Sequence, residues 1–201
     1  MNIKLYVEGA ARHSDFDRAV CRQAFSEFFA AAGLNHRPRT IPCGGRKQAY
    51  DAFVTAIKTH RPGELPLLLV DSETPRAPGM TKWRHLKGRL GDHWDQPAGA
   101  GEDQVFLMVQ VMETWFIADR EALREFFKPK FKESKIPAWP HLENITKSAV
   151  YDALESATAE CGQKQYSKGH LSFQLLKGIP PAKVEAACPH AKALLDCLRN
   201  L

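Results

Sequence analysis

Acidic residues follow three of the apolar runs in this 201-residue chain. Glu8 comes after IKLYV, Asp71 and Glu73 come after LLLV, and Glu113 comes after VFLMVQVM. The pattern offers carboxylate oxygens without His or Cys, and such hard ligands favour Mg²⁺, or Mn²⁺, over zinc. In an extended D-x-E segment both carboxylates point to the same side, where they would hold one ion or bridge two. An ion held there would orient a water and offset the charge on a phosphodiester during in-line attack.

These acids meet only if their strands share one sheet. Strands are predicted at 3–7, 37–43, 67–70 and 105–112, with amphipathic helices after the first two. LLLV is apolar on successive residues, as in a parallel strand covered on both faces, whereas two prolines suit 37–43 to an edge. Alternating strands and helices predict an α/β fold with a mostly parallel four-stranded sheet flanked by helices, and reactive groups of such sheets collect at the carboxyl ends of the strands.

The chain divides by composition near residue 128. We expect an α/β core over 1–128, including a long loop over 72–103, and a helical extension over 129–201 packed on that core. Within the extension, helical patterns cover about 147–160 and 181–199. Asp119 is placed to cap a turn that includes Glu121.

A structural interpretation of the acids stays open. An acid after a strand often caps a helix or a turn, which applies to Glu8 and Asp71. Glu113 would also be favoured in a first helical turn because of the helix dipole.

Composition sets the class of protein and its partners. Hydrophobic residues at 44% and charged residues at 25% exclude disordered and fibrous proteins, and a formal charge of +5 with a pI near 9.0 favours a polyanion such as nucleic acid. Five scattered cysteines without a C-x-x-C pair suggest neither disulfides nor a zinc site, so we expect a cytoplasmic protein. No apolar run approaches 18 residues, so no membrane segment is expected.

Three groups of cations are candidates for binding phosphate. The first group is Gly44, Gly45, Arg46 and Lys47. It lies at a predicted helix start, where backbone N–H groups would help to bind phosphate. The alternative is an ordinary turn with two solvated cations. The second lies in KWRHLKGRLGDHW, where Lys82 and Arg84 alternate with Trp83 and Trp94. That mixture suits a surface that stacks on bases, or a docked cover with packed tryptophans. The third group lies in the helical extension and consists of Lys147, Lys164 and Lys168. These cations would stabilise phosphate charge if the extension folds back over the acidic edge of the sheet. Lys168 is the preferred catalytic cation.

Five segments together resemble the DUF4276 family, which is similar to Toprim domains: YVEGA, PCGGRKQAYDAF, LLLVDSE, LMVQVMETWFIAD and YSKGH. The resemblance implies a Toprim-like parallel sheet. Glu8 matches the Toprim glutamate of acid/base chemistry or metal binding, and Asp71 with Glu73 matches the D-x-D pair, here D-x-E. Glu113 lies in the M-E-x-W-x-x-A-D signature. Some relatives are the nuclease partner of an ABC-type ATPase in PARIS anti-phage defence, which implies cleavage of tRNA.

The leading hypothesis is therefore a Mg²⁺-dependent nuclease of phage defence that cleaves RNA or DNA. Glu8, Asp71, Glu73 and Lys168 would carry the chemistry, and Glu113 would be a further metal ligand. The alternative is a catalytically silent Toprim-like subunit that docks on an ABC-type ATPase. Phosphotransfer on a small nucleotide is a weaker third hypothesis, because the chain has no phosphate-loop motif. A homodimer also stays open.

Overall fold

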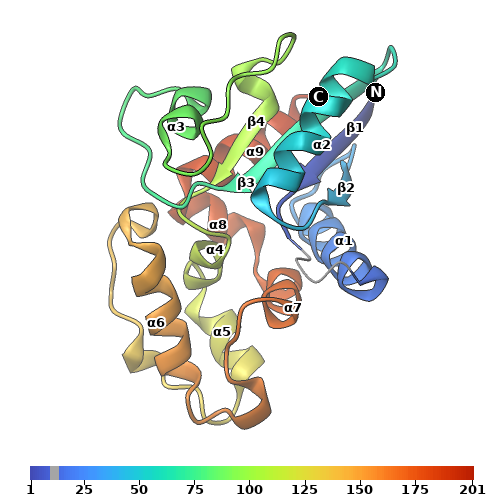
Figure 1. Ribbon diagram of the computed structural model, residues 1–201. Coiled ribbons are helices and arrows are strands. Elements are labelled where there is room, and N and C mark those ends of the chain that lie inside the picture. The colour runs from blue at the N-terminus through green and yellow to red at the C-terminus, as the bar shows by residue number, and fades with distance from the viewer. Residues whose placement is uncertain (10–13) are drawn as a thin grey trace.

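The fold is built on one parallel sheet, seen in Figure 1. A computed structural model describes residues 1–9 and 14–201. The strand order is β2-β1-β3-β4, with β1 at Asn2–Val7, β2 at Arg39–Pro42, β3 at Glu64–Asp71 and β4 at Val105–Met108. All three strand pairs are parallel. The predicted α/β class and four-stranded sheet are confirmed, and the proline-containing strand lies at an edge as expected.

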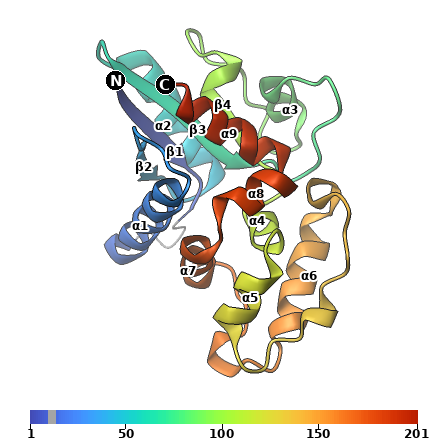
Figure 2. The ribbon, with the colours of Figure 1, turned by 180° about the vertical axis from the view of Figure 1, so that it is seen from behind.

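Strand β3 is buried on both faces because successive side chains alternate between two apolar layers. Leu67 and Leu69 pack in one cluster with α1 (Asp15–Ala31) and α9 (Pro189–Arg199). Leu68 and Val70 pack in the other with α2 (Arg46–Thr59). Figures 1 and 2 show α2 on one side of the sheet and α9 on the other. The continuous apolar run is thus explained by two covered faces.

Five further helices, α4 to α8, lie beyond the carboxyl ends of the strands, with α4 to α7 in the lower half of Figure 1. They share one apolar cluster with β1, β3, α1 and α9. Their bounds are α4 at Glu113–Ile117, α5 at Arg120–Phe127, α6 at Lys147–Thr158, α7 at His170–Gly178 and α8 at Pro181–Ala187. Short 3-10 turns lie at Glu102–Gln104, Glu133–Lys135, Leu142–Asn144 and Gly162–Lys164.

Two details follow from local chemistry. The Oδ1 atom of Asp119 accepts backbone N–H bonds from Glu121 at 3.0 Å and from Ala122 at 3.2 Å, which confirms the predicted cap. The helix predicted over 181–199 is divided into α8 and α9 because Pro189 begins α9 and cannot donate a backbone hydrogen bond.

The segment over 72–103 differs from the predicted loop, because it contains α3 (Lys82–Gly88). The Thr81 hydroxyl accepts from the backbone N–H of Arg84 at 3.2 Å, and Glu102 accepts from those of Lys82 and Trp83. These side chains satisfy the first turn of the helix. Strand β4 is also shorter than predicted, since the chain turns after Met108 toward α4.

The tryptophans of this segment belong to the core. Trp83 and Trp94 are 3% and 6% exposed. Trp94 stacks on Tyr50 with ring centroids 4.6 Å apart, and Trp83 lies 5.9 Å from Phe53. The docked-cover interpretation is therefore right, and stacking of these rings on bases is wrong, because their faces are already occupied.

In the described part of the chain, no helix has both the length and the apolar character required to cross a bilayer.

Replacing Trp83 with Ala should lower the free energy of unfolding by about 3 to 5 kcal/mol, because the change empties a packed site. Chemical denaturation measures this loss. Arg84→Ala, on the exposed side of the same helix, is the matched control and should stay within about 0.5 kcal/mol. A Trp83 variant as stable as the wild type would contradict the assignment of this ring to the core.

Candidate metal centre

Three carboxylates meet at the carboxyl edge of β1 and β3. One ligand oxygen from each of Glu8, Asp71 and Glu73 lies within 4.8 Å of the others. The parallel register aligns Val7 with Leu69, and the backbone N–H of Glu8 donates to the Leu69 carbonyl at 3.1 Å. The backbone N–H of Asp71 then donates to Oε2 of Glu8 at 3.2 Å. Strand pairing therefore fixes two of the acids side by side.

Glu73 adopts a left-handed backbone conformation, with φ of 65°. This region costs a residue with a side chain about 1 to 3 kcal/mol, and Gly would occupy it without strain. The backbone N–H of Glu73 donates to the Gln110 carbonyl at 2.8 Å, which helps to hold the turn. The turn brings the Glu73 carboxylate back beside Asp71, which is what the site requires.

Asp71 is the most buried acid of the three, with 3% of its surface exposed. Its Oδ1 accepts the backbone N–H of Met112 at 2.9 Å. Burial raises the pKa of Asp71 well above its ordinary value, and the charges of Glu8 and Glu113 raise it further against the opposing charge of Lys168. Burial likewise raises the pKa of Glu8, although Arg46 and Lys168 oppose the shift. A bound divalent cation would favour the ionised form of both acids.

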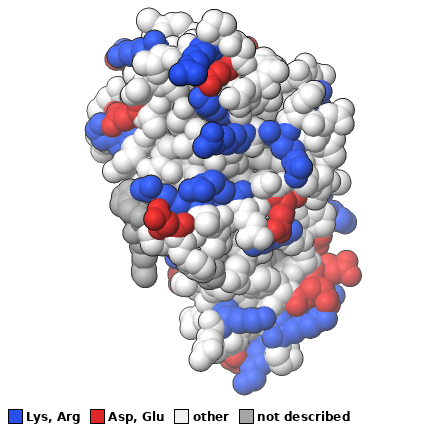
Figure 3. Space-filling model, turned by 90° about the vertical axis from the view of Figure 1, so that its right-hand side faces the viewer, with Lys and Arg blue, Asp and Glu red and all other residues white. Residues whose placement is uncertain are grey.

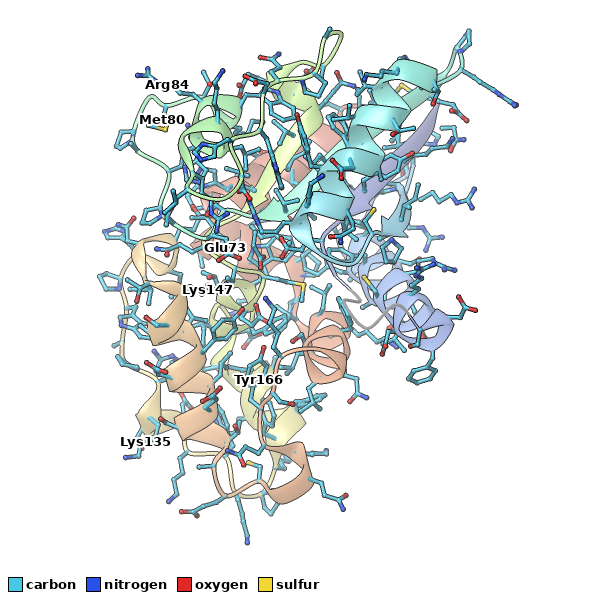
Figure 4. The ribbon with its side chains drawn as sticks, viewed as in Figure 1. Glu73, Met80, Arg84, Lys135, Lys147 and Tyr166 are labelled. Carbon is cyan, nitrogen blue, oxygen red and sulfur yellow. The ribbon has the colours of Figure 1, made fainter. Side chains whose placement is uncertain are left out.

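Each acid of the group has a cation beside it. Lys147 lies 2.6 Å from Glu73, and Figure 4 shows these two side chains close together between the sheet and α6. Arg46 lies 3.5 Å from Glu8, and Lys168 lies 3.7 Å from Asp71. Burial alone would lower the pKa of Lys168, but the charges of Asp71 and Glu113 outweigh it and the pKa is raised. Lys168 therefore stays an ammonium group at neutral pH.

The guanidinium of Arg46 joins three parts of the site. It donates to the Asp71 carbonyl and to the carboxylate of Asp92, and it stacks 5.0 Å from the Trp94 ring centroid. Asp92 also pairs with Arg89 at 2.7 Å, and Arg89 lies 3.8 Å from Glu73. Arg89 belongs to the segment KWRHLKGRLGDHW, whose cations were candidates for binding a nucleic-acid backbone, but its pairing with Glu73 and the role of Asp92 could not be predicted from the sequence.

Glu113 lies outside the group of three and is 1% exposed. Its Oε1 accepts from the Tyr166 hydroxyl at 2.7 Å and from Ser172 at 3.1 Å, while its Oε2 lies 3.3 Å from the Tyr151 hydroxyl. Three hydroxyl donors thus occupy the carboxylate that was predicted to bind metal. Glu113 instead joins α4 to α6 and α7. Tyr166 lies in the YSKGH segment, but no spacing in the sequence pairs it with Glu113.

The other predicted phosphate ligands are divided between the site and the surface. Gly44 and Gly45 line the same cavity as Glu8 and Asp71. Four cations lie elsewhere. Lys47 pairs with Asp51, Lys82 packs over the Phe106 ring, Arg84 is exposed on α3 and far from Glu73 in Figure 4, and Lys164 donates to the Phe126 carbonyl.

The donor set fits a hard divalent cation. The three carboxylates supply oxygen ligands only, and partial burial restricts access of water. Four neighbouring cations, Arg46, Arg89, Lys147 and Lys168, could bind anionic oxygens around such an ion. The arrangement is chemically suited to phosphoryl groups, which carry several anionic oxygens.

Asp71→Asn should stabilise the protein in the absence of metal. Because the pKa of Asp71 is raised in the folded protein, the native state keeps this proton to a higher pH than the unfolded chain does, so wild-type stability falls as pH rises above the ordinary aspartate pKa of 3.8. The variant lacks this penalty at pH 7. Thermal unfolding in EDTA from pH 5 to pH 8 should show a smaller fall for the variant. A variant less stable than wild type throughout would contradict the direction of the shift.

Glu113→Gln should leave the stabilisation by added Mn²⁺ unchanged, because Glu113 lies outside the group of three. The variant should still lose about 1 to 3 kcal/mol of stability, since Gln accepts fewer of the three hydroxyl bonds. Thermal unfolding with and without Mn²⁺ separates the two effects. Loss of the Mn²⁺ shift would show that Glu113 is a ligand after all.

Comparison with known proteins supports the resemblance seen in the sequence. The model of the DUF4276 family, described as a domain of unknown function, matches residues 7–199. No curated protein and no solved structure matches the chain. Because the family model covers nearly the whole sequence, the chain belongs to the DUF4276 family.

Proposed function

We propose that this protein is a Toprim-like, Mg²⁺-dependent phosphodiesterase, a nuclease acting on RNA or DNA. The observation that carries the proposal is the group formed by Glu8, Asp71 and Glu73, with ligand oxygens within 4.8 Å of one another. Oxygen-only ligation favours Mg²⁺ or Mn²⁺, and Mg²⁺ usually takes one or two carboxylates and leaves positions for water and phosphate. When bound, the ion would supply a polarised water and neutralise charge on the phosphoryl group.

The protein's own groups have distinct tasks in hydrolysis. The oxygen of water forms a bond to phosphorus, and the bond to the leaving ester oxygen breaks. Glu8, whose pKa is raised by burial, is suited to take the proton of the water and return a proton to the leaving oxygen. Asp71 and Glu73 would hold the metal. Lys168, kept charged by its acidic neighbours, would stabilise the anionic oxygens.

The positive charge on one face of the molecule supports a polyanionic substrate. Figure 3 looks onto the side of the molecule that carries β2 and α1, and Lys and Arg side chains are spread over its upper half. Arg37 and Arg39 at this edge are exposed. Such a surface attracts a phosphate backbone independently of sequence. The Toprim resemblance alone supports the further proposal that the protein is a cytoplasmic effector of anti-phage defence with an ABC-type ATPase as partner.

A second function is favoured by one observation. Glu8, Asp71 and Glu73 each have a cation beside them, so the acids are neutralised without any ion. That arrangement also suits a silent subunit that docks on an ATPase and needs no metal. Divalent-ion binding by the isolated protein distinguishes the two, because only the nuclease requires it.

Glu8→Gln and Asp71→Asn should each lower metal-stimulated cleavage of nucleic acid by at least about a hundredfold, because each removes a proton acceptor or a metal ligand. Cleavage of mixed RNA and DNA substrates with Mg²⁺ or Mn²⁺ measures the loss. Matched controls are Glu125→Gln and Asp51→Asn, whose carboxylates are exposed and do not belong to the group of three. Wild-type cleavage by both site variants, folded as judged by circular dichroism, would overturn the proposal.

A further inference from the structure

A cavity of about 500 Å³ adjoins the carboxylate group on one side. Glu8 and Asp71 line it, together with Glu113 and Lys168, whereas Glu73 does not. The carboxylate group therefore lies at the border of the cavity. A ligand in the cavity would contact Glu8 and Asp71 but not Glu73.

The size of the cavity selects a small occupant. Its volume lies within the range of pockets that hold single small molecules, about 300 to 1,000 Å³. A nucleic-acid duplex cannot enter, because its major groove alone is about 12 Å wide. One nucleotide unit is of suitable size.

The lining combines apolar and polar groups in the way a nucleotide requires. Met108, Met112 and Phe173, which are largely buried, contribute apolar atoms to the lining, and Lys168 offers a charge for phosphate. Gly9 and Gly44 line one part of the cavity, where their backbones exchange two hydrogen bonds of 2.8 Å. A Cβ atom on Gly9 would lie 2.9 Å from the Phe173 ring, which is closer than a normal contact between these atoms. Gly at this position therefore allows the Phe173 ring to pack against the backbone of the cavity wall.

The surroundings of Glu73 have a different character. Glu73 pairs with Lys147 at 2.6 Å and with Arg89 at 3.8 Å, and none of these three residues lines the cavity. Two cations next to the candidate metal position, but outside the cavity, suit the phosphate that follows the cleaved bond. The site thus offers a cavity beside Glu8 and Asp71 and two cations beside Glu73.

From this asymmetry we infer that the cavity takes the base and sugar of one unpaired nucleotide, with the cleaved phosphate at the carboxylate group. The inference rests on the proposed function and defines its substrate class as single-stranded or locally unpaired nucleic acid. A paired nucleotide would first have to leave its helix, which costs a few kcal/mol. The strand continues outward past Lys147 and Arg89.

Binding tests the cavity without reference to cleavage. With Ca²⁺ in place of Mg²⁺, adenosine 5′-monophosphate and a short single-stranded oligonucleotide should both raise the melting temperature. Ser167→Trp enlarges an exposed lining residue and should weaken both ligands at least about tenfold, which is about 1.4 kcal/mol. Ser134→Trp, exposed and not a lining residue, is the matched control.

A second variant tests the cavity independently of Ser167→Trp. Gly45 lines the cavity with an ordinary φ of −78°, and an added Cβ meets only the movable end of Gln48. Gly45→Leu should therefore weaken both ligands as well, while Gly178→Leu, at an open position away from the cavity, should not. Absence of binding by wild type, or wild-type affinity in both cavity variants, would overturn the inference. Binding of the mononucleotide but not of the oligonucleotide would identify a free nucleotide as ligand and also overturn it.

Cleavage separates this inference from the proposed function. With Mg²⁺, wild type should cut the single strand at least about tenfold faster than the same sequence in a blunt duplex, because the duplex must first unpair. Equal rates would overturn the substrate class and leave the nuclease standing. No cleavage of either substrate would overturn the nuclease, and the binding result alone would then decide whether the cavity takes a nucleotide.

Discussion

The parallel pairing of β1 with β3 is the constraint on which the site depends. Because Val7 lies opposite Leu69, Glu8 leaves its strand beside the end of β3, where Asp71 emerges. A shift of one residue in this register would move the side chains of β3 to the opposite faces of the sheet. Leu67 and Leu69 pack in one apolar layer and Leu68 and Val70 in the other, so such a shift would disrupt both layers. Burial of the strand thus fixes the position of the acids.

Charge balance explains how acids can remain at this buried edge. The carboxylates of Glu8, Asp71, Glu73 and Asp92 lie among four cations, Arg46, Arg89, Lys147 and Lys168. These cations offset the charge of the ionised acids, and buried Asp71 keeps its proton to a higher pH than usual. The acids are therefore tolerated here without an ion. A divalent ion would add positive charge to the group, and a phosphoryl anion bound with it would offset that charge.

The sequence predicted the features that depend on neighbours along the chain. Strand periodicity and the order of strands and helices were enough to place Glu8, Asp71 and Glu73 at one edge, because parallel strands end together. The sequence could not show that Tyr166 and Ser172 surround Glu113, since these contacts join residues 53 and 59 positions apart. Asp92 likewise had no signal in the sequence, and nothing in the sequence paired Arg89 with Glu73. Trp83 and Trp94 were ambiguous because a ring beside cations is as common in a core as on a binding surface.

The segment after residue 128 supplies cations that lie beside the acids of the candidate site. Lys147 begins α6 and Lys168 precedes α7, so two of the four cations come from this segment. Glu113 receives hydroxyl bonds from the same segment, and these bonds join α4 to the chain on either side of Lys168. The sheet therefore positions the three carboxylates, whereas the cations beside them come both from the core, with Arg46 and Arg89, and from the segment beyond it, with Lys147 and Lys168.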